Sequence, residues 1–304
     1  MRVGGQAIME GVLMRSPNFW GMAVRTPAGD MDIKAEPFRS VTKKSKIFRL
    51  PVIRGFLSLA ETLWLGMKVL TLSTNIALGE EEELSKKEIA FTLLFGLGLA
   101  LLLFLVAPVL GTKGLGALLG SSIENPILFN LVEGVLRILI FVAYLVGITA
   151  ASRDIKRFFG YHGAEHKAIK VYERGEELVP ENSRKLDTSH VRCGTSFVLY
   201  VLVMSILVFS LLGVEGWLYM IVSRIVVIPL VAGIAFEFIM WSARHKDNGI
   251  VQLLVWPGLQ LQKLTTREPS DDMVEVAMAS LKKVLSMEEA SNLEPNEATN
   301  KLVI

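Results

Sequence analysis

Two histidines with a glutamate between them form the feature of this sequence best suited to chemistry. His162, Glu165 and His166 lie in the run His-Gly-Ala-Glu-His. On a helix, residues four apart face the same side, so both imidazoles can reach one cation. Glu165 then lies about 60° around the helix from His162, where it can act as general base on a water molecule. This is the logic of the inverted zincin motif, and it predicts a zinc site with Glu165 as catalytic residue.

Further residues of the metal-ligand type follow shortly after this run. His190 and the single cysteine, Cys193, lie within the same polar part of the chain. Zinc with three protein ligands keeps an open position for catalysis, whereas four protein ligands close the site and make it structural. We predict a metal site that combines both histidines of the motif with His190, Cys193 or both. Two alternatives remain: a solvated helix face without metal, and a Cys193 nucleophile with a histidine as its base.

Glu10 is the second candidate catalytic residue. It lies in a glycine-rich run, residues 4–11. The run has too many glycines for a helix and predicts a tight turn with close backbone approach. It is not a P-loop, because the Gly-Lys-Ser/Thr element is missing. Glu10 could supply an additional acid to the site.

Composition places these residues in a membrane protein. Of the 304 residues 51% are hydrophobic, and the apolar residues come in runs long enough for a bilayer, which takes about 20 residues per helix. The formal net charge of only +2 does not indicate a nucleic-acid-binding protein. A single cysteine cannot form an internal disulfide. Four runs qualify as membrane spans: residues 89–110, 127–150, 196–214 and 217–240.

Basic residues set the predicted orientation of the spans. Lys and Arg crowd the segment before the first span and open the segments after the second and fourth, whereas the short loops within the two hairpins are nearly free of them. By the positive-inside rule, both termini and residues 151–195 face the cytoplasm. We therefore expect a multi-pass protein of a bacterial inner membrane, in contact with the lipid bilayer. The start of the chain lacks the apolar core of a cleavable signal peptide.

Residues 51–79 are apolar enough to form a fifth span, but basic residues flank both ends and disfavour crossing. Polar residues recur along one side of the expected helix. This pattern predicts that the helix is interfacial or re-entrant and that its polar stripe faces protein. A full membrane span is the alternative. The stripe consists of Arg54, Ser58, Glu61, Lys68 and Asn75.

Charged residues within the predicted spans are costly and should face protein or water. Glu133 and Arg137 are four residues apart and can neutralise each other, and Arg224 falls at a similar depth on the fourth span. We predict a polar clasp between helices, with solute binding by the Glu133–Arg137 pair as the alternative. Glu237, near the cytoplasmic end of the fourth span, is a candidate supporting carboxylate for the metal site.

The two ends of the chain have different characters. A turn at residues 27–30 predicts a β-hairpin within a β-rich N-terminal region. Residues 273–285 predict an amphipathic helix, and the Glu- and Asn-rich tail from Ser286 predicts disorder.

The fold class is thus a mainly α membrane protein with two transmembrane hairpins. Its predicted regions are 1–48 (β-rich), 49–88 (interfacial or re-entrant helix), 89–150 (first hairpin), 151–195 (His/Cys insert), 196–240 (second hairpin) and 241–304 (C-terminal segment).

Four separated motifs resemble those of the bacterial YqhQ family. The resemblance extends to about Ser286 and implies a membrane protein predicted to be a metal-dependent enzyme. It also implies that six candidate residues belong to family motifs: Glu10, His162, Glu165, His166, His190 and Cys193. It supplies neither substrate nor reaction. The family often has Pro where this chain has Val191, which is not a ligand type. The motifs are Gly-Gly-Gln-Ala-Ile-Met-Glu-Gly-Val-Leu-Met-Arg (residues 4–15), Tyr-His-Gly-Ala-Glu-His-Lys (161–167), Arg-Cys-Gly-Thr-Ser-Phe (192–197) and Leu-Thr-Thr-Arg-Glu-Pro (264–269).

Two hypotheses of function follow from these residues. The first is a zinc-dependent hydrolase that acts on a lipid or peptide substrate at the cytoplasmic face of the membrane. The second is a non-enzymatic membrane transporter, or a scaffold with a structural zinc site. The number of protein ligands separates a catalytic zinc from a structural one.

Overall fold

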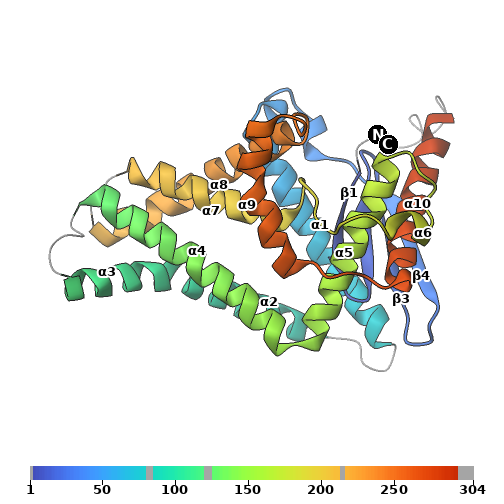
Figure 1. The fold of residues 1–304 in the computed structure, drawn as a ribbon, viewed down its shortest axis with the longest axis horizontal. Helices are drawn as coiled ribbons and strands as arrows, with labels where there is room; N and C mark the ends of the chain where they lie inside the picture. The colour runs from blue at the N-terminus through green and yellow to red at the C-terminus, as the bar shows by residue number, and fades with distance from the viewer. Residues whose placement is uncertain (1–2, 80–84, 120–124, 213–215, 294–304) are drawn as a thin grey trace.

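The structure is a computed structural model that describes residues 3–79, 85–119, 125–212 and 216–293. Figure 1 shows a group of long helices beside a part in which further helices lie next to the sheet. A π-helical segment, η4, joins α2 and α3 into one helical run. The helices are α1 (Ile53–Leu78), α2 (Lys86–Leu101), η4 (Leu102–Val106), α3 (Ala107–Leu119), α4 (Pro126–Ala151), α5 (Arg153–Glu173), α6 (Pro180–Ser183), α7 (Gly194–Ser210), α8 (Gly216–Ser242), α9 (Gly249–Thr265) and α10 (Asp271–Leu293).

Four of these helices are long and apolar enough to cross a membrane. Three of them, in the α2–α3 run, α4 and α8, coincide with predicted spans. The predicted third span is α7, whose 17 residues reach about 26 Å, slightly less than the hydrocarbon core of about 30 Å. The fourth helix that meets the criterion is α1, in the stretch for which a full span was the alternative. The apolar segments are Ile53–Leu78, Lys87–Leu118, Pro126–Ala151 and Val222–Ser242.

The predicted β-rich region is an antiparallel sheet of four strands in the order β1-β2-β3-β4. The predicted hairpin is confirmed: Arg25 pairs with Met31 across the turn at residues 27–30. The glycine-rich run forms β1, a two-residue turn and the start of β2, with Glu10 at a positive φ of 50°. The strands are β1 (Gly4–Ile8), β2 (Gly11–Arg15), β3 (Phe19–Arg25) and β4 (Met31–Pro37).

Alternation along the strands gives the sheet two apolar faces. Val12 and Met14 face α5 and α10, whereas Leu13 and Met22 face Leu65 of α1. Helices from three distant parts of the chain therefore cover both faces of the sheet, and α1 lies between the sheet and α8.

Two features of the C-terminal segment differ from prediction. The helix α10 continues through Ser286 to Leu293, into residues expected to be disordered. Its polar end is held by Glu288, whose carboxylate accepts hydrogen bonds from the Ser16 hydroxyl at 2.7 Å and the Asn18 N–H at 2.8 Å. The helix α9 was not predicted, because Pro257 and polar residues interrupt its apolar pattern.

The polar stripe of α1 faces protein, as predicted. Glu61 accepts a hydrogen bond from the Ser40 hydroxyl, and Lys68 pairs with Glu36 at 3.2 Å. Arg54 pairs with Glu237 of α8 at 2.6 Å. Glu237 therefore supports the contact between α1 and α8, and its prediction as a supporting carboxylate of the metal site finds no support in this geometry.

The predicted polar clasp between helices is confirmed. The buried carboxylate of Glu133 contacts the guanidinium groups of both Arg137 and Arg224. Arg137 also donates a hydrogen bond from Nε to the carbonyl of Phe104, in η4, at 2.8 Å. Pro108 lies four residues after Phe104 and has no N–H to bond this carbonyl, so the helix irregularity supplies an acceptor to the clasp.

Candidate metal centre

Helix α5 carries the His-Gly-Ala-Glu-His run on a buried face. Ser152 caps the helix, since its side chain accepts a hydrogen bond from the Ile155 N–H at 3.2 Å. Gly163 is required by packing rather than by flexibility, because a Cβ there would lie 2.1 Å from the carbonyl oxygen of Arg267. The predicted helix is thus confirmed, and its glycine admits the segment that follows α9.

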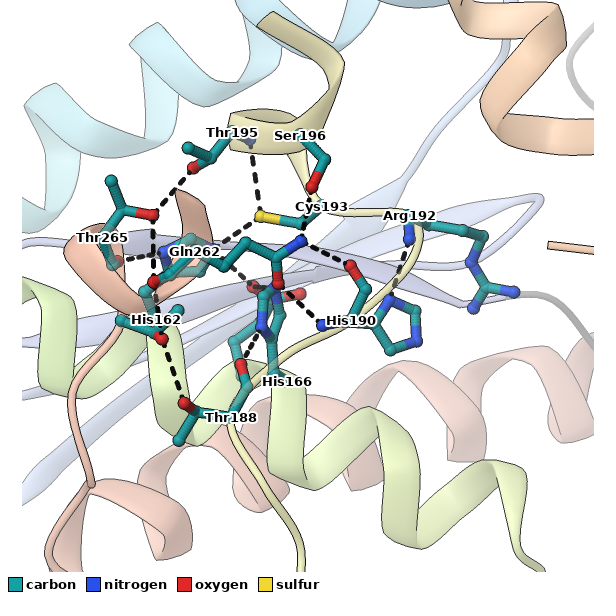
Figure 2. Close-up of polar contacts among 12 residues, drawn as sticks. His162, His166, Thr188, His190, Arg192, Cys193, Thr195, Ser196, Gln262 and Thr265 are labelled. Atoms are coloured by element: carbon teal, nitrogen blue, oxygen red, sulfur yellow. Dashed lines mark hydrogen bonds and ion pairs between the residues drawn. The ribbon is translucent and has the colours of Figure 1, made fainter. Parts of the chain in front are cut away.

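Cys193 brings the second element to the site. It immediately precedes α7 and caps that helix, with Sγ accepting a hydrogen bond from the Thr195 N–H at 3.4 Å. The same sulfur lies 3.2 Å from Nε2 of His162 (Figure 2). Ligand atoms of His162, His166 and Cys193 all lie within 4.8 Å of one another, the one such group found in the described ranges.

Backbone carbonyls orient both imidazoles of this His/His/Cys group. Nδ1 of His162 lies 2.7 Å from the carbonyl oxygen of Thr265, at the end of α9. Nδ1 of His166 lies 2.5 Å from the carbonyl oxygen of Thr188. A carbonyl only accepts, so each Nδ1 carries the proton and each Nε2 presents a lone pair. Both lone pairs are therefore available to a metal on the side of the Cys193 sulfur.

Glu165 lies beside this group without belonging to it. One carboxylate oxygen is 3.9 Å from Nε2 of His162 and 3.8 Å from Nε2 of His166. Burial raises the pKa of Glu165 to about 7, an effect that His162 and Arg192 partly offset. A carboxyl with this pKa can exchange a proton near neutral pH, as a general base must.

His190 lies next to the group but is turned toward other partners. Its ring centroid is 5.6 Å from that of His166. Its Nε2 lies 3.5 Å from a carboxylate oxygen of Glu173, and its Nδ1 accepts a hydrogen bond from the Arg192 N–H at 3.3 Å. The hydrogen bond from His190, together with the charge of Arg192, lowers the pKa of Glu173 to about 2. Because both ring nitrogens have partners, this geometry favours Cys193 over His190 as third ligand.

Glu10 is held away from the three ligand groups. Its carboxylate forms a two-pronged ion pair with Arg157, at 2.5 and 2.6 Å, and accepts a hydrogen bond from the Tyr161 hydroxyl at 3.2 Å. Tyr161 precedes Glu165 by one helical turn, about 6 Å along α5. Glu10 therefore fixes the β1–β2 turn to α5, and its prediction as an acid within the site finds no support in the geometry.

Sequence reasoning missed the residues that support the ligands. The side chain of Gln262 is fully buried, accepts a hydrogen bond from the His190 N–H at 2.7 Å and donates to the Ser196 hydroxyl at 2.6 Å. It thereby fixes the loop that carries Cys193 (Figure 2). The motif that contains Thr265 was a usable signal. No pattern marked Gln262 or Thr188.

Comparison with known proteins identifies the family. A family model described as "Protein of unknown function (DUF1385)" matches residues 50–287. The chain is 31% identical over 301 residues to "Uncharacterized protein YqhQ" of Bacillus subtilis (strain 168), which covers 95% of this chain and 93% of that protein. The chain belongs to this family. No solved structure matches it.

The four motifs that resemble the YqhQ family meet at one place in the fold. The second and third supply the ligand groups. The fourth supplies the Thr265 carbonyl and passes over Gly163. The first brings Gly5 against Glu165, where a Cβ would lie 2.6 Å from Cγ of the glutamate. Residues far apart in the sequence thus shape a single site.

Proposed function

We propose that this chain is a four-span membrane protein with a zinc site of His162, His166 and Cys193, and that it is a metal-dependent hydrolase with Glu165 as general base. The observation that carries the proposal is the convergence of two carbonyl-oriented imidazoles and one thiol beside a buried carboxylate. The membrane would be a bacterial inner membrane, with both termini in the cytoplasm, in line with the basic residues that flank the spans.

The packing of the sheet supports this choice of spans. β1 and β2 contact α5, and α10 contacts α5 and β3, so these elements lie on one side of the membrane. Between β4 and α5 the chain passes through α1, the α2–α3 run and α4. Only an even number of crossings returns it to the same side, so α1 does not cross if the other two do. Between α5 and α10, with α9 on the same side as these two helices, the same rule requires α7 to cross with α8.

The donor set fits zinc. Zinc binds imidazole nitrogen at about 2.0–2.1 Å and thiolate sulfur at about 2.3 Å, so tetrahedral ligand atoms lie roughly 3.3–3.7 Å apart. The separation of 3.2 Å between Cys193 Sγ and His162 Nε2 is close to this spacing. Glu165 lies near both nitrogens but outside the group of three, which suits a residue that contacts a fourth, non-protein ligand.

The chemistry follows from the position of Glu165. A zinc ion bound here would polarise a carbonyl or phosphoryl oxygen of the substrate and acidify a water molecule. Glu165 would accept the proton of that water on a carboxylate oxygen and later return it to the leaving group. Cys193 lies directly before α7, where the chain would enter the membrane, so the site would lie close to the interface at which a lipid or a peptide substrate is presented.

Metal analysis tests the proposal. Protein purified from membranes without chelators should hold about one zinc per chain, and X-ray absorption should report two nitrogen ligands, one sulfur and one light atom. The H162A/H166A double variant should lose the metal. Absence of metal from folded wild-type protein would overturn the proposal.

A structural zinc site is the second candidate, and burial favours it. Side-chain exposure is 2% for His166, 6% for Glu165 and 15% for His162, which leaves little access for a substrate. Four protein ligands in the absorption spectrum would support this alternative. If the zinc is structural, the E165Q variant should keep the activity of the wild-type protein. If the protein is a hydrolase, E165Q should abolish turnover and keep the zinc.

A further inference from the structure

The side of α1 opposite the sheet is an exposed apolar face. Leu65 and Val69 pack against the sheet, whereas apolar side chains on the other side are open, with Trp64 64% exposed. Their spacing places them on one face of the helix. If α1 does not cross the membrane, this face has no partner among the described residues. Its members are Ile53, Phe56, Leu63, Trp64 and Met67.

A basic segment precedes this face and continues it. Two short helical turns, Val41–Lys43 and Ile47–Arg49, contact α1. Ile47 and Leu50 are exposed apolar residues of the same segment. The sequence contains no acidic residue between Glu36 and Glu61. The exposed basic side chains here are Lys43, Lys44, Lys46 and Arg49.

The contact with α8 places the start of this face against the C-terminal half of that helix. A Cβ on Gly55 would lie 2.8 Å from the carbonyl oxygen of Gly233, and Arg54 pairs with Glu237. Gly233 and Glu237 lie nine and five residues before the end of α8 at Ser242, about 14 and 8 Å along the helix axis. Figure 1 shows α1 running across the end of the helix group rather than alongside it.

We infer that α1 and the basic segment before it form a surface that lies on the cytoplasmic leaflet and binds anionic phospholipid. The apolar face enters the boundary between headgroups and acyl chains, as amphipathic interfacial helices do. The lysines and arginine contact the anionic headgroups, which attract basic segments close to a membrane. The inference rests on the membrane topology of the proposed function but is independent of its metal.

Depth measurement tests the placement of α1. The depths of nitroxide labels at F56C, W64C and M67C are compared in full-length protein in phosphatidylglycerol-containing bilayers. The unmodified chain serves as the labelling blank, because Cys193 is buried. All three should lie at one shallow depth. A steady change of depth from F56C to M67C, or access to a water-soluble nickel reagent at all three, would overturn the inference. Controls are L94C on α2 for the bilayer core and K34C on β4 for water.

The L94C control separates failure of this inference from failure of the proposed topology. A label at L94C within the bilayer, together with aqueous labels on α1, refutes only the membrane surface and leaves the apolar face to a protein partner. An aqueous label at L94C refutes the spans themselves.

Charge removal tests the lipid class. The K44Q/K46Q variant should bind phosphatidylglycerol roughly tenfold more weakly in a native mass spectrometry titration, since each lysine near a membrane contributes several-fold to affinity. The K282Q/K283Q variant on α10 removes the same charge from an exposed site away from α1 and should bind as wild type does. Equal loss in both variants, or loss in neither, would refute anionic recognition by this segment.

Discussion

Gly5 of β1 lies directly against Glu165 of α5. A Cβ on Gly5 would be 2.6 Å from Cγ and 2.8 Å from a carboxylate oxygen of the glutamate. The missing side chain therefore gives the carboxylate its place between the sheet and the two imidazoles. Although β1 carries no ligand, its backbone defines one wall of the site.

G5A should displace Glu165 and leave the three ligand groups in place. Overpacking of a close contact typically costs about 1–3 kcal/mol, so the purified protein should unfold at a lower temperature while keeping its zinc. The matched control is G4A, because no atom lies within 4 Å of a Cβ built there. Unchanged thermal stability of G5A would show that Glu165 does not occupy this place.

Single substitutions should divide the candidate ligands into two classes. H162A, H166A and C193A should each lower the zinc content of the purified protein, because their ligand atoms form the converging group. H190A should keep it, because the ring nitrogens of His190 contact Glu173 and Arg192.

The control for the ligand series is H245A, whose ring lies beside Trp241 at the end of α8. It should hold as much zinc as wild type. Loss of zinc in H190A with retention in C193A would instead make His190 the third ligand.

The metal-free protein should become less stable as the pH rises through the window set by Glu165. The ordinary pKa of the carboxyl is 4.5 and burial raises it to about 7 in the folded chain. Between these values the folded state holds a proton that the unfolded state has lost, so stability falls as pH rises through the window. Chelator-treated wild type should therefore lose several degrees of unfolding temperature between about pH 5 and about pH 8 relative to E165Q.

E275Q provides the control for that pH series, because Glu275 of α10 is 56% exposed. Its difference from wild type should not change across the same range. A constant difference between E165Q and wild type would mean that the Glu165 carboxyl titrates normally.

Local patterns were sufficient to predict much of this fold. Apolar runs long enough for a membrane located α2–α3, α4 and α8, and turn residues located the β3–β4 hairpin. The spacing of His162 and His166 placed both on one helical face, because helix periodicity is a local property.

Features that depend on tertiary contacts were not predicted. The carbonyl oxygens of Thr188 and Thr265 orient the imidazoles, but every residue has a carbonyl, so side-chain type gives no signal. The choice between His190 and Cys193 depends on the path of a loop fixed by Gln262. The end of α10 is held by contacts with the β2–β3 turn that composition cannot reveal.

E133Q should destabilise the fold rather than only impair transport. Glu133 is 2% exposed and contacts the guanidinium groups of Arg137 and Arg224, on two different helices. Removal of one member of a buried ion pair typically costs about 3–5 kcal/mol, so the unfolding temperature in detergent should fall markedly. The matched control is E237Q, which removes the carboxylate of the more exposed pair with Arg54 and should cost about 1 kcal/mol or less. If E133Q unfolds at the wild-type temperature yet loses uptake of a solute, the clasp is a binding site. That result would favour the transporter hypothesis over the hydrolase hypothesis.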